Sequence, residues 1–97
     1  MSYFVTSAFN FETVTVATTS IGLTTTLNDN VGFRAVISCE TAQCRYRYDG
    51  GAPTATVGHL LNIGDLIIFE GRANVANFRA IRTGGTSAVL QVTIETF

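Results

Sequence analysis

The chain has 97 residues, of which 46% are hydrophobic and 13% are charged, and it contains no lysine. This length predicts one domain with a single modest core. The net charge of -1 lacks the basic excess typical of nucleic-acid binding, and no apolar run approaches a membrane span of about 18 residues, so neither partner is expected. Residues 1–4 lack the basic and apolar segments of a secretory signal, which predicts a protein made in the cytoplasm.

The N-terminal segment, residues 1–10, is uncharged and carries the aromatic side chains Tyr3, Phe4 and Phe9. We expect it to be either an ordinary first strand or an arm that packs on a neighbouring subunit, because aromatic side chains are enriched where proteins meet. The remaining residues, 11–97, are expected to form the main domain.

The first half of this domain contains two stretches with the alternation of a strand. Residues 11–19 alternate and are rich in β-branched side chains, which predicts a strand. Residues 24–27 are either a second short strand or an irregular edge, and residues 28–30 have the composition of a turn. Residues 33–40 predict another strand with apolar character on both faces, as is typical of a central strand.

The most regular alternation begins at Cys44. Because successive strand side chains point to opposite sides, Cys44, Tyr46 and Tyr48 share one face. We expect this face to pack in the core. Arg45 and Arg47 are then expected to point outward, where they pair with acidic side chains or contact another subunit. An Asp-Gly-Gly turn and a proline end the strand.

The two cysteines lie on either side of a predicted turn. This turn, near residues 41–42, is expected to join residues 33–40 and 44–48 as a hairpin. The hairpin would make a disulfide between Cys39 and Cys44 sterically feasible. Free buried thiols are favoured, because cytoplasmic thiols usually stay reduced.

Weaker patterns follow the proline. Residues 54–59 predict a connection or a short edge strand, and residues 62–65 predict a tight turn. Residues 66–70 form a continuous apolar run of strand length. Such a run predicts burial on both sides or at a contact.

The next segment fits two periods. Three apolar residues have helical spacing behind Asn74, a candidate helix cap: Val75, Phe78 and Ile81. Residues 77–82 also alternate as a strand. We favour the strand, because so short a helix is marginal.

The chain ends with a turn and a strand. Residues 83–86 predict a hairpin turn. Residues 87–96 predict a strand with four inward side chains: Ala88, Leu90, Val92 and Ile94. Together the patterns predict an all-β fold, a single immunoglobulin-like β-sandwich of seven to eight short, mainly antiparallel strands.

The candidate catalytic groups do not form a recognisable motif. His59 is the only histidine, and its sequence neighbours supply no nucleophile or orienting acid. The aspartates lie in turns, where they cap the backbone, and the glutamates lie at outward positions or at strand ends. Gly84 and Gly85 precede no helix N-terminus that would hold a phosphate. We therefore expect no enzymatic activity, no metal and no cofactor.

Residues 45–54, Arg-Tyr-Arg-Tyr-Asp-Gly-Gly-Ala-Pro-Thr, resemble part of the small all-β virion proteins of tailed bacteriophages and prophages. The resemblance covers about residues 33–96. It implies a virion structural protein, above all a capsid decoration (cement) protein on the capsid surface, with a tail or head-tail position as the alternative. The implied partners are the major capsid protein or another virion protein.

An interaction surface and an oligomeric state follow as expectations. A symmetric lattice favours a cyclic homo-oligomer such as a trimer. The candidate protein-interaction residues are Tyr3, Phe4, Phe9, Arg45 and Arg47.

The same turn is also similar to that of immunoglobulin-like modules appended to bacterial glycosidases. The matching residues are Tyr46, Asp49, Gly50, Pro53 and Thr54. This resemblance implies a sandwich and leaves a carbohydrate-binding adhesion module as a further alternative, in which tyrosine side chains form a sugar-stacking platform. Core packing is the favoured interpretation of Tyr46 and Tyr48.

Overall fold

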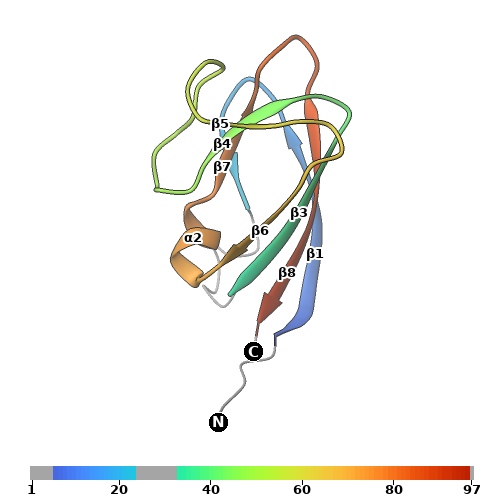
Figure 1. Cartoon of the computed structure of the whole chain (residues 1–97), viewed down its shortest axis with the longest axis vertical. Helices are drawn as coiled ribbons and strands as arrows, with labels where there is room; N and C mark the ends of the chain where they lie inside the picture. The colour runs from blue at the N-terminus through green and yellow to red at the C-terminus, as the bar shows by residue number, and fades with distance from the viewer. Residues whose placement is uncertain (1–5, 24–32, 97) are drawn as a thin grey trace.

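The computed structural model describes residues 6–23 and 33–96. Its strands form two antiparallel four-stranded sheets, packed face to face (Figure 1). Sheet I has the order β1-β8-β3-β6 and contains β1 (Ser7–Val16), β8 (Ala88–Thr96), β3 (Arg34–Glu40) and β6 (Leu66–Glu70). Sheet II has the order β2-β7-β4-β5 and contains β2 (Ile21–Gly22), β7 (Arg79–Arg82), β4 (Cys44–Arg47) and β5 (His59–Leu61). A short helix, α2 (Arg72–Asn77), joins β6 to β7.

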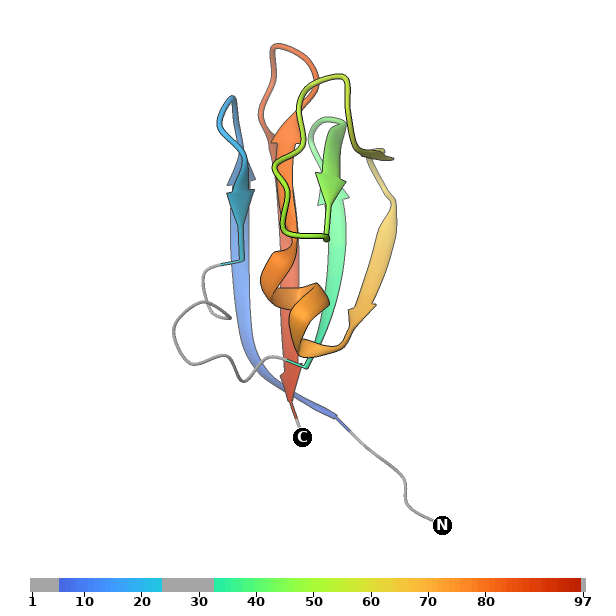
Figure 2. The same cartoon turned by 90° about the vertical axis from the view of Figure 1, so that its left-hand side faces the viewer.

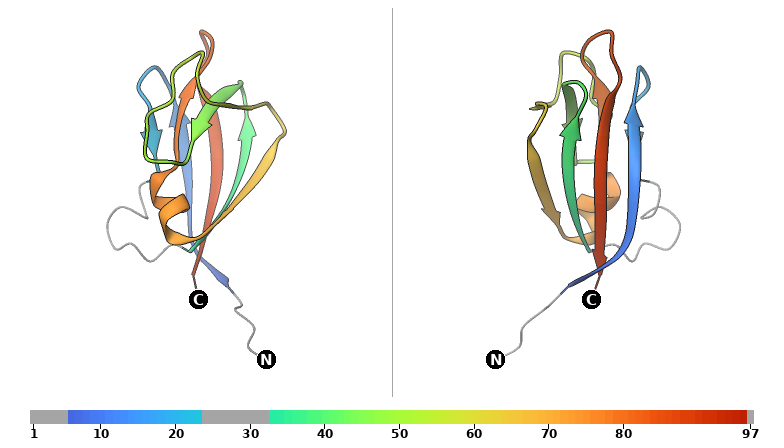
Figure 3. Two further views of the ribbon diagram at one scale, coloured as in Figure 1. Left: turned by 60° about the vertical axis from the view of Figure 1, so that its left-hand side comes forward. Right: turned by 90° about the vertical axis from the view of Figure 1, so that its right-hand side faces the viewer.

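The strand order is that of a jelly roll. β1 pairs with β8, β2 with β7, β3 with β6 and β4 with β5, so the first half of the chain pairs with the second half in reverse order. Two four-stranded sheets connected in this way define the jelly-roll architecture. Figure 3 shows the strands of sheet I side by side in the order β6, β3, β8 and β1.

The predicted all-β, mainly antiparallel sandwich is confirmed by this architecture. The immunoglobulin-like arrangement is not confirmed. Immunoglobulin constant-type domains place their first two strands side by side in one sheet. In this protein β1 and β2 lie in different sheets, and the last strand occupies the place next to β1.

The core lies between the two sheets and depends on strict alternation along the strands. In β8, the four residues predicted to point inward, Ala88, Leu90, Val92 and Ile94, are completely buried. β3 lies between β8 and β6, which confirms the prediction of a central strand. Its inward residues Ala35, Ile37 and Cys39 are buried in the same layer.

Two predicted hairpins are wrong. β3 belongs to sheet I and β4 to sheet II, so the turn at residues 41–42 carries the chain across the core. The turn at residues 83–86 likewise connects β7 of sheet II with β8 of sheet I. Turn residues specify a chain reversal, but they do not specify whether the next strand pairs in the same sheet or packs in the facing one. Among the described strands, only β4 and β5 are both consecutive and paired.

Of the two alternatives predicted for residues 66–70, burial on both sides is wrong, and burial at a contact stays a prediction. β6 is an edge strand of sheet I, paired with β3 alone. Phe69 points into the core and is buried, whereas Leu66 and Ile68 point outward and are 58% and 47% exposed. The apolar run therefore has one buried face and one exposed apolar face.

The segment with two periods forms a helix followed by a strand. α2 covers Arg72–Asn77 and buries Val75, and its N-cap is Gly71 rather than Asn74. β7 begins at Arg79, which confirms the strand prediction for residues 79–82. Phe78, the residue between them, is completely buried. Figure 2 shows α2 packed at one end of the sandwich.

The N-terminal prediction is tested only from residue 6 onward. β1 begins at Ser7, so residues 7–10 continue into the strand predicted from residue 11, with a register shift between Ala8 and Asn10. β2 lies at Ile21–Gly22, a segment for which no strand was predicted. Tyr3, Phe4, the short run at residues 24–27 and the turn at residues 28–30 lie outside the described residues.

Candidate functional site

The outer face of β4 is covered by the loop between β4 and β5, residues 48–58. Arg45 donates hydrogen bonds from Nε to the carbonyl oxygen of Ala55 (3.1 Å) and from Nη1 to that of Gly58 (2.8 Å). Arg47 donates from Nη1 to the carbonyl oxygen of Ala52 (3.4 Å). Both arginines point outward as predicted, and they hold this loop against the sheet.

The loop begins with a bidentate ion pair. Arg47 donates to both carboxylate oxygens of Asp49, from Nε to Oδ1 at 3.0 Å and from Nη2 to Oδ2 at 2.7 Å. Asp49 Oδ1 also accepts from the backbone N–H of Gly51 at 3.2 Å, as predicted for an aspartate in a turn. The Arg47 hydrogen bonds, followed by that of Gly51, lower the pKa of Asp49 to about 2.

Behind this ion pair lies a continuous aromatic cluster. The completely buried Phe78 contacts Phe69 and Tyr46, with ring centroids 5.3 and 5.8 Å apart. Tyr46 lies 6.4 Å from Tyr48 and 5.4 Å from His59. Tyr46 packs against the core as predicted. The core prediction is wrong for Tyr48, which is 41% exposed, although its ring contacts Phe69 of β6 and His59 of β5.

The Arg47–Asp49 ion pair and the exposed rings line the same pocket. A cavity of about 310 Å³ is lined by Arg47, Tyr48, Asp49 and His59. We call it the edge pocket, because it lies where β4 ends beside the edge strand β5. The side chain of His59, for which the sequence indicated no catalytic partners, is exposed and lines this pocket.

A second surface is the outer face of sheet I. The register sets Phe11, Thr93, Val36 and Ile68 in one row across the four strands, and Thr13, Gln91, Ser38 and Leu66 in the next row. None of these eight side chains carries a charge. Phe11 is 59% exposed, and Leu66 and Ile68 are similarly exposed on the opposite edge strand. We call these eight residues the uncharged face.

Hydrogen bonds order the polar part of the uncharged face. Thr13 Oγ1 donates to Gln91 Oε1 at 2.8 Å, and Gln91 Nε2 donates to Glu40 Oε1 at 2.9 Å. These bonds link β1, β8 and β3 and end at the carboxylate of Glu40. Thr13 and Gln91 are therefore held in place, and the exposed apolar side chains lie at the two edges of the sheet.

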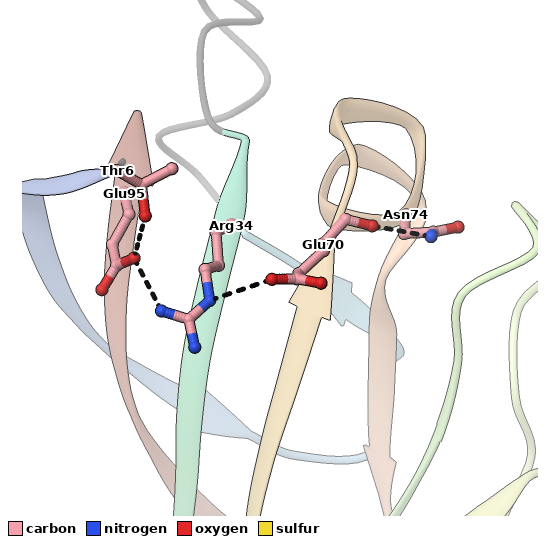
Figure 4. A network of polar contacts seen from close by, with 5 residues as sticks. All are labelled: Thr6, Arg34, Glu70, Asn74 and Glu95. Atoms are coloured by element: carbon pink, nitrogen blue, oxygen red, sulfur yellow. Dashed lines mark hydrogen bonds and ion pairs between the residues drawn. The ribbon is translucent and has the colours of Figure 1, made fainter. Parts of the chain in front are cut away.

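Charged residues mark the other end of the same sheet (Figure 4). Arg34 Nη1 lies 2.9 Å from Glu95 Oε1, and Arg34 Nε lies 3.6 Å from Glu70 Oε2. Thr6 Oγ1 donates to the same Glu95 oxygen at 2.7 Å, and Asn74 Nδ2 donates to the backbone oxygen of Glu70. The hydrogen bonds from Thr6 and then Arg34 lower the pKa of Glu95.

The thiols of Cys39 and Cys44 belong to the core. Both are free and buried, in agreement with the favoured prediction. Cys39 Sγ contacts the carbonyl oxygen of Ala42 at 3.2 Å. Burial raises the pKa of both thiols, that of Cys44 to about 12. They are therefore poor nucleophiles near neutral pH.

Within residues 6–23 and 33–96, no group of three or more His, Cys, Asp or Glu side chains is arranged to hold a metal ion. No helix in the same ranges is long and apolar enough to cross a membrane.

The three predicted interaction residues that the structure describes do not lie together, since Phe9 belongs to sheet I and Arg45 and Arg47 belong to sheet II. Arg45 and Arg47 bind the β4–β5 loop, and Phe9 is 40% exposed on β1. The uncharged face was missed, because it depends on the register between strands from distant parts of the sequence. The local signal for this face is that two successive outward positions are uncharged in each of three strands: Phe11 and Thr13 in β1, Val36 and Ser38 in β3, and Gln91 and Thr93 in β8.

Comparison with known proteins identifies no relative: no protein family, curated protein or solved structure matches the chain.

Proposed function

We propose that this protein is a structural component of a phage virion and, more specifically, a capsid decoration protein that binds the assembled shell. The observation that supports this proposal is the uncharged face of sheet I. Charged side chains are depleted at the centre of protein interfaces. Eight uncharged side chains in two rows, with Phe11, Leu66 and Ile68 exposed, have this composition.

The proposed activity is stabilisation by mass action. A protein that binds the assembled shell, but not its dissociated subunits, shifts the equilibrium toward the shell. At a concentration of 100 times Kd, one such site stabilises the bound state by about 2.7 kcal/mol. Repetition over a lattice multiplies this effect without any catalytic group.

The resemblance of residues 45–54 to small phage virion proteins agrees with this proposal, and jelly rolls occur in viral capsid proteins. The same architecture also occurs in lectin domains and cupins, so fold alone does not decide the function. The uncharged face favours a structural role, because it offers a broad surface rather than a site for one small molecule.

The proposed partner is the major capsid protein, and the proposed location is the outer surface of the capsid. The edge strand β6 contributes Leu66 and Ile68 to the uncharged face and, among the described strands, is paired with β3 alone. Such an edge is suited to pairing with a neighbouring chain. A cyclic homo-oligomer, such as a trimer, would be placed on a symmetry axis of the lattice.

The proposal is tested by adding the purified protein to shells that lack it and measuring thermal disruption of the shells. We expect the wild type to raise the disruption temperature and Ile68→Ser to lose most of this effect. Leu60→Ser is the matched control: Leu60 is 45% exposed but lies in β5 of sheet II. Both substitutions remove an exposed apolar side chain and should leave folding nearly unchanged.

Electron cryo-microscopy of the complete particle provides the second measurement. Density at the lattice symmetry axes, with sheet I against the capsid protein, is the expected result. Density at the tail or neck alone would contradict the decoration role and favour the head-tail alternative. Shells whose disruption temperature does not respond to the wild-type protein would also contradict it.

A further inference from the structure

The edge pocket combines an aromatic surface with a polar pair. The ring planes of Tyr48 and His59 are inclined by only 31°, and their centroids are 6.3 Å apart. Tyr46 lies against both rings at interplanar angles of 26° and 39°. The two exposed rings therefore lie next to each other at a shallow angle, and Arg47 and Asp49 line the same pocket as a 2.7 Å ion pair.

Contacts within the protein hold the side chains of the pocket in the ligand-free structure. Phe69 lies behind Tyr48 with ring centroids 4.9 Å apart. Asp49 is held by Arg47 and by the Gly51 N–H, and Arg47 is held in turn by the carbonyl oxygen of Ala52. Ligand binding therefore orders few side chains, which lowers its entropic cost.

The charges of the pocket select against ionic ligands. The guanidinium of Arg47 and the carboxylate of Asp49 neutralise each other at 2.7 Å. An anion would have to compete with Asp49 for Arg47, and a cation would have to compete with Arg47 for Asp49. A neutral ligand with several hydroxyl groups instead finds acceptors on Asp49 and donors on Arg47, and both groups retain further hydrogen-bonding capacity.

We propose that the edge pocket is a carbohydrate-binding site that takes a neutral pyranose ring. Tyr48 and His59 contact the apolar C–H face of the sugar, while Asp49 accepts hydrogen bonds from its hydroxyl groups and Arg47 donates to them. A cavity of about 310 Å³ lies at the lower end of the range of small-molecule sites, which suits one or two sugar units. This site is separate from the uncharged face, which lies on sheet I.

The test is a titration of the 15N-labelled protein with D-glucose, D-galactose, D-mannose and N-acetyl-D-glucosamine, followed by NMR. Each sugar is added to about 50 mM, which detects dissociation constants in the millimolar range. We expect at least one sugar to shift the amide signals of Tyr48, Asp49 and His59. Tyr48→Ala should weaken binding about tenfold or more, because it removes the stacking ring. Tyr48→Phe should retain binding, because it keeps the ring.

Two controls keep the outcome decisive. Leu60→Ser removes an exposed apolar side chain outside the pocket lining and should bind the sugar like the wild type. His59→Ala, on the exposed end of β5, tests the second ring in case Tyr48→Ala loses the dispersed NMR spectrum of a folded protein. Weaker binding in either folded ring variant, with normal binding in the control, supports the proposal.

Three results would overturn it. The first is that none of the four sugars shifts any amide signal. The second is that the shifts persist unchanged in the folded variants Tyr48→Ala and His59→Ala. The third is that Tyr48→Ala loses binding to shells, which would make the pocket part of a protein interface. Failure of the decoration role is recognised separately: sugar binding would be normal while Ile68→Ser and the wild type are equally inactive on shells.

Discussion

Arg34 and Glu95 form a 2.9 Å ion pair directly across the neighbouring strands β3 and β8. The Glu95 oxygen that accepts from Arg34 also accepts from Thr6 Oγ1 at 2.7 Å. One carboxylate oxygen thus links the two central strands of sheet I with the residue just before β1. The pair lies beside the row of Val36 and Thr93, at the end of sheet I where β6 leads into α2 (Figure 4).

We expect Glu95→Gln to lower the free energy of unfolding by about 1 kcal/mol, because it replaces two charge-assisted hydrogen bonds with weaker ones. Urea denaturation measures the change. Glu70→Gln is the matched control: this carboxylate lies 3.6 Å from Arg34 and its side chain is 71% exposed, so its loss should cost less than about 0.5 kcal/mol. Equal effects of the two substitutions would contradict the assigned role of Glu95.

A second prediction concerns the Arg47–Asp49 ion pair at low pH. The folded-state pKa of Asp49, about 2, lies below its ordinary value of 3.8. The stabilisation from its ionised form is therefore fully present above about pH 4 and is lost as the pH falls through about 2. We expect the amide signals of residues 49–52 to change in this window, and Asp49→Asn to show altered signals already at pH 7. Signals that are unchanged down to pH 2 would contradict the assignment.

The thiols give a prediction at high pH. Burial, the largest cause, raises the pKa of Cys44 from 9.0 to about 12, so the folded state favours the protonated thiol. The resulting stabilisation is present below pH 9 and declines as the pH rises toward about 12, at most by about 1.4 kcal/mol per pH unit for one thiol. Cys44→Ala should remove this part of the pH dependence in urea denaturation.

Labelling with iodoacetamide at pH 8 provides an independent check on the same thiols. In the folded protein both Cys39 and Cys44 should remain unlabelled, because the reagent attacks the thiolate and both side chains are buried. Addition of urea above the unfolding midpoint should label both. Rapid labelling of the folded protein would contradict the buried positions.

Local sequence patterns predicted the strands well where burial alternates strictly. Ala88, Leu90, Val92 and Ile94 show this in β8, where every second residue is completely buried. For the apolar run of β6, only the alternative of burial on both sides is wrong, because the sequence does not show that Ile68 lies on an edge strand with its side chain outward. Composition records how apolar a segment is, whereas the sheet order decides which of its faces is covered.

Strand partners could not be predicted, and the candidate sites depend on them. The jelly roll pairs β1 with β8 and β2 with β7, which join residues from opposite ends of the chain. Turn chemistry acts over a few residues and therefore does not specify these pairs. The uncharged face brings Phe11 and Ile68 into one row through this pairing. Of the edge pocket, by contrast, Arg47, Tyr48 and Asp49 are adjacent in the sequence.

The last prediction compares two phenylalanines with opposite environments. Phe78 is completely buried between α2 and β7, and its ring lies 5.3 Å from Phe69 and 5.8 Å from Tyr46. Phe78→Ala should lower the free energy of unfolding by about 3–5 kcal/mol, because it leaves a cavity in the core. Phe11→Ala removes the same atoms from a residue that is 59% exposed and should cost less than about 1 kcal/mol. Because Tyr46 contacts both Phe78 and Tyr48, Phe78→Ala should also shift the edge-pocket amide signals, whereas Phe11→Ala should not. Similar losses of stability in urea denaturation would contradict the assignment of Phe78 to the core and of Phe11 to the outer face.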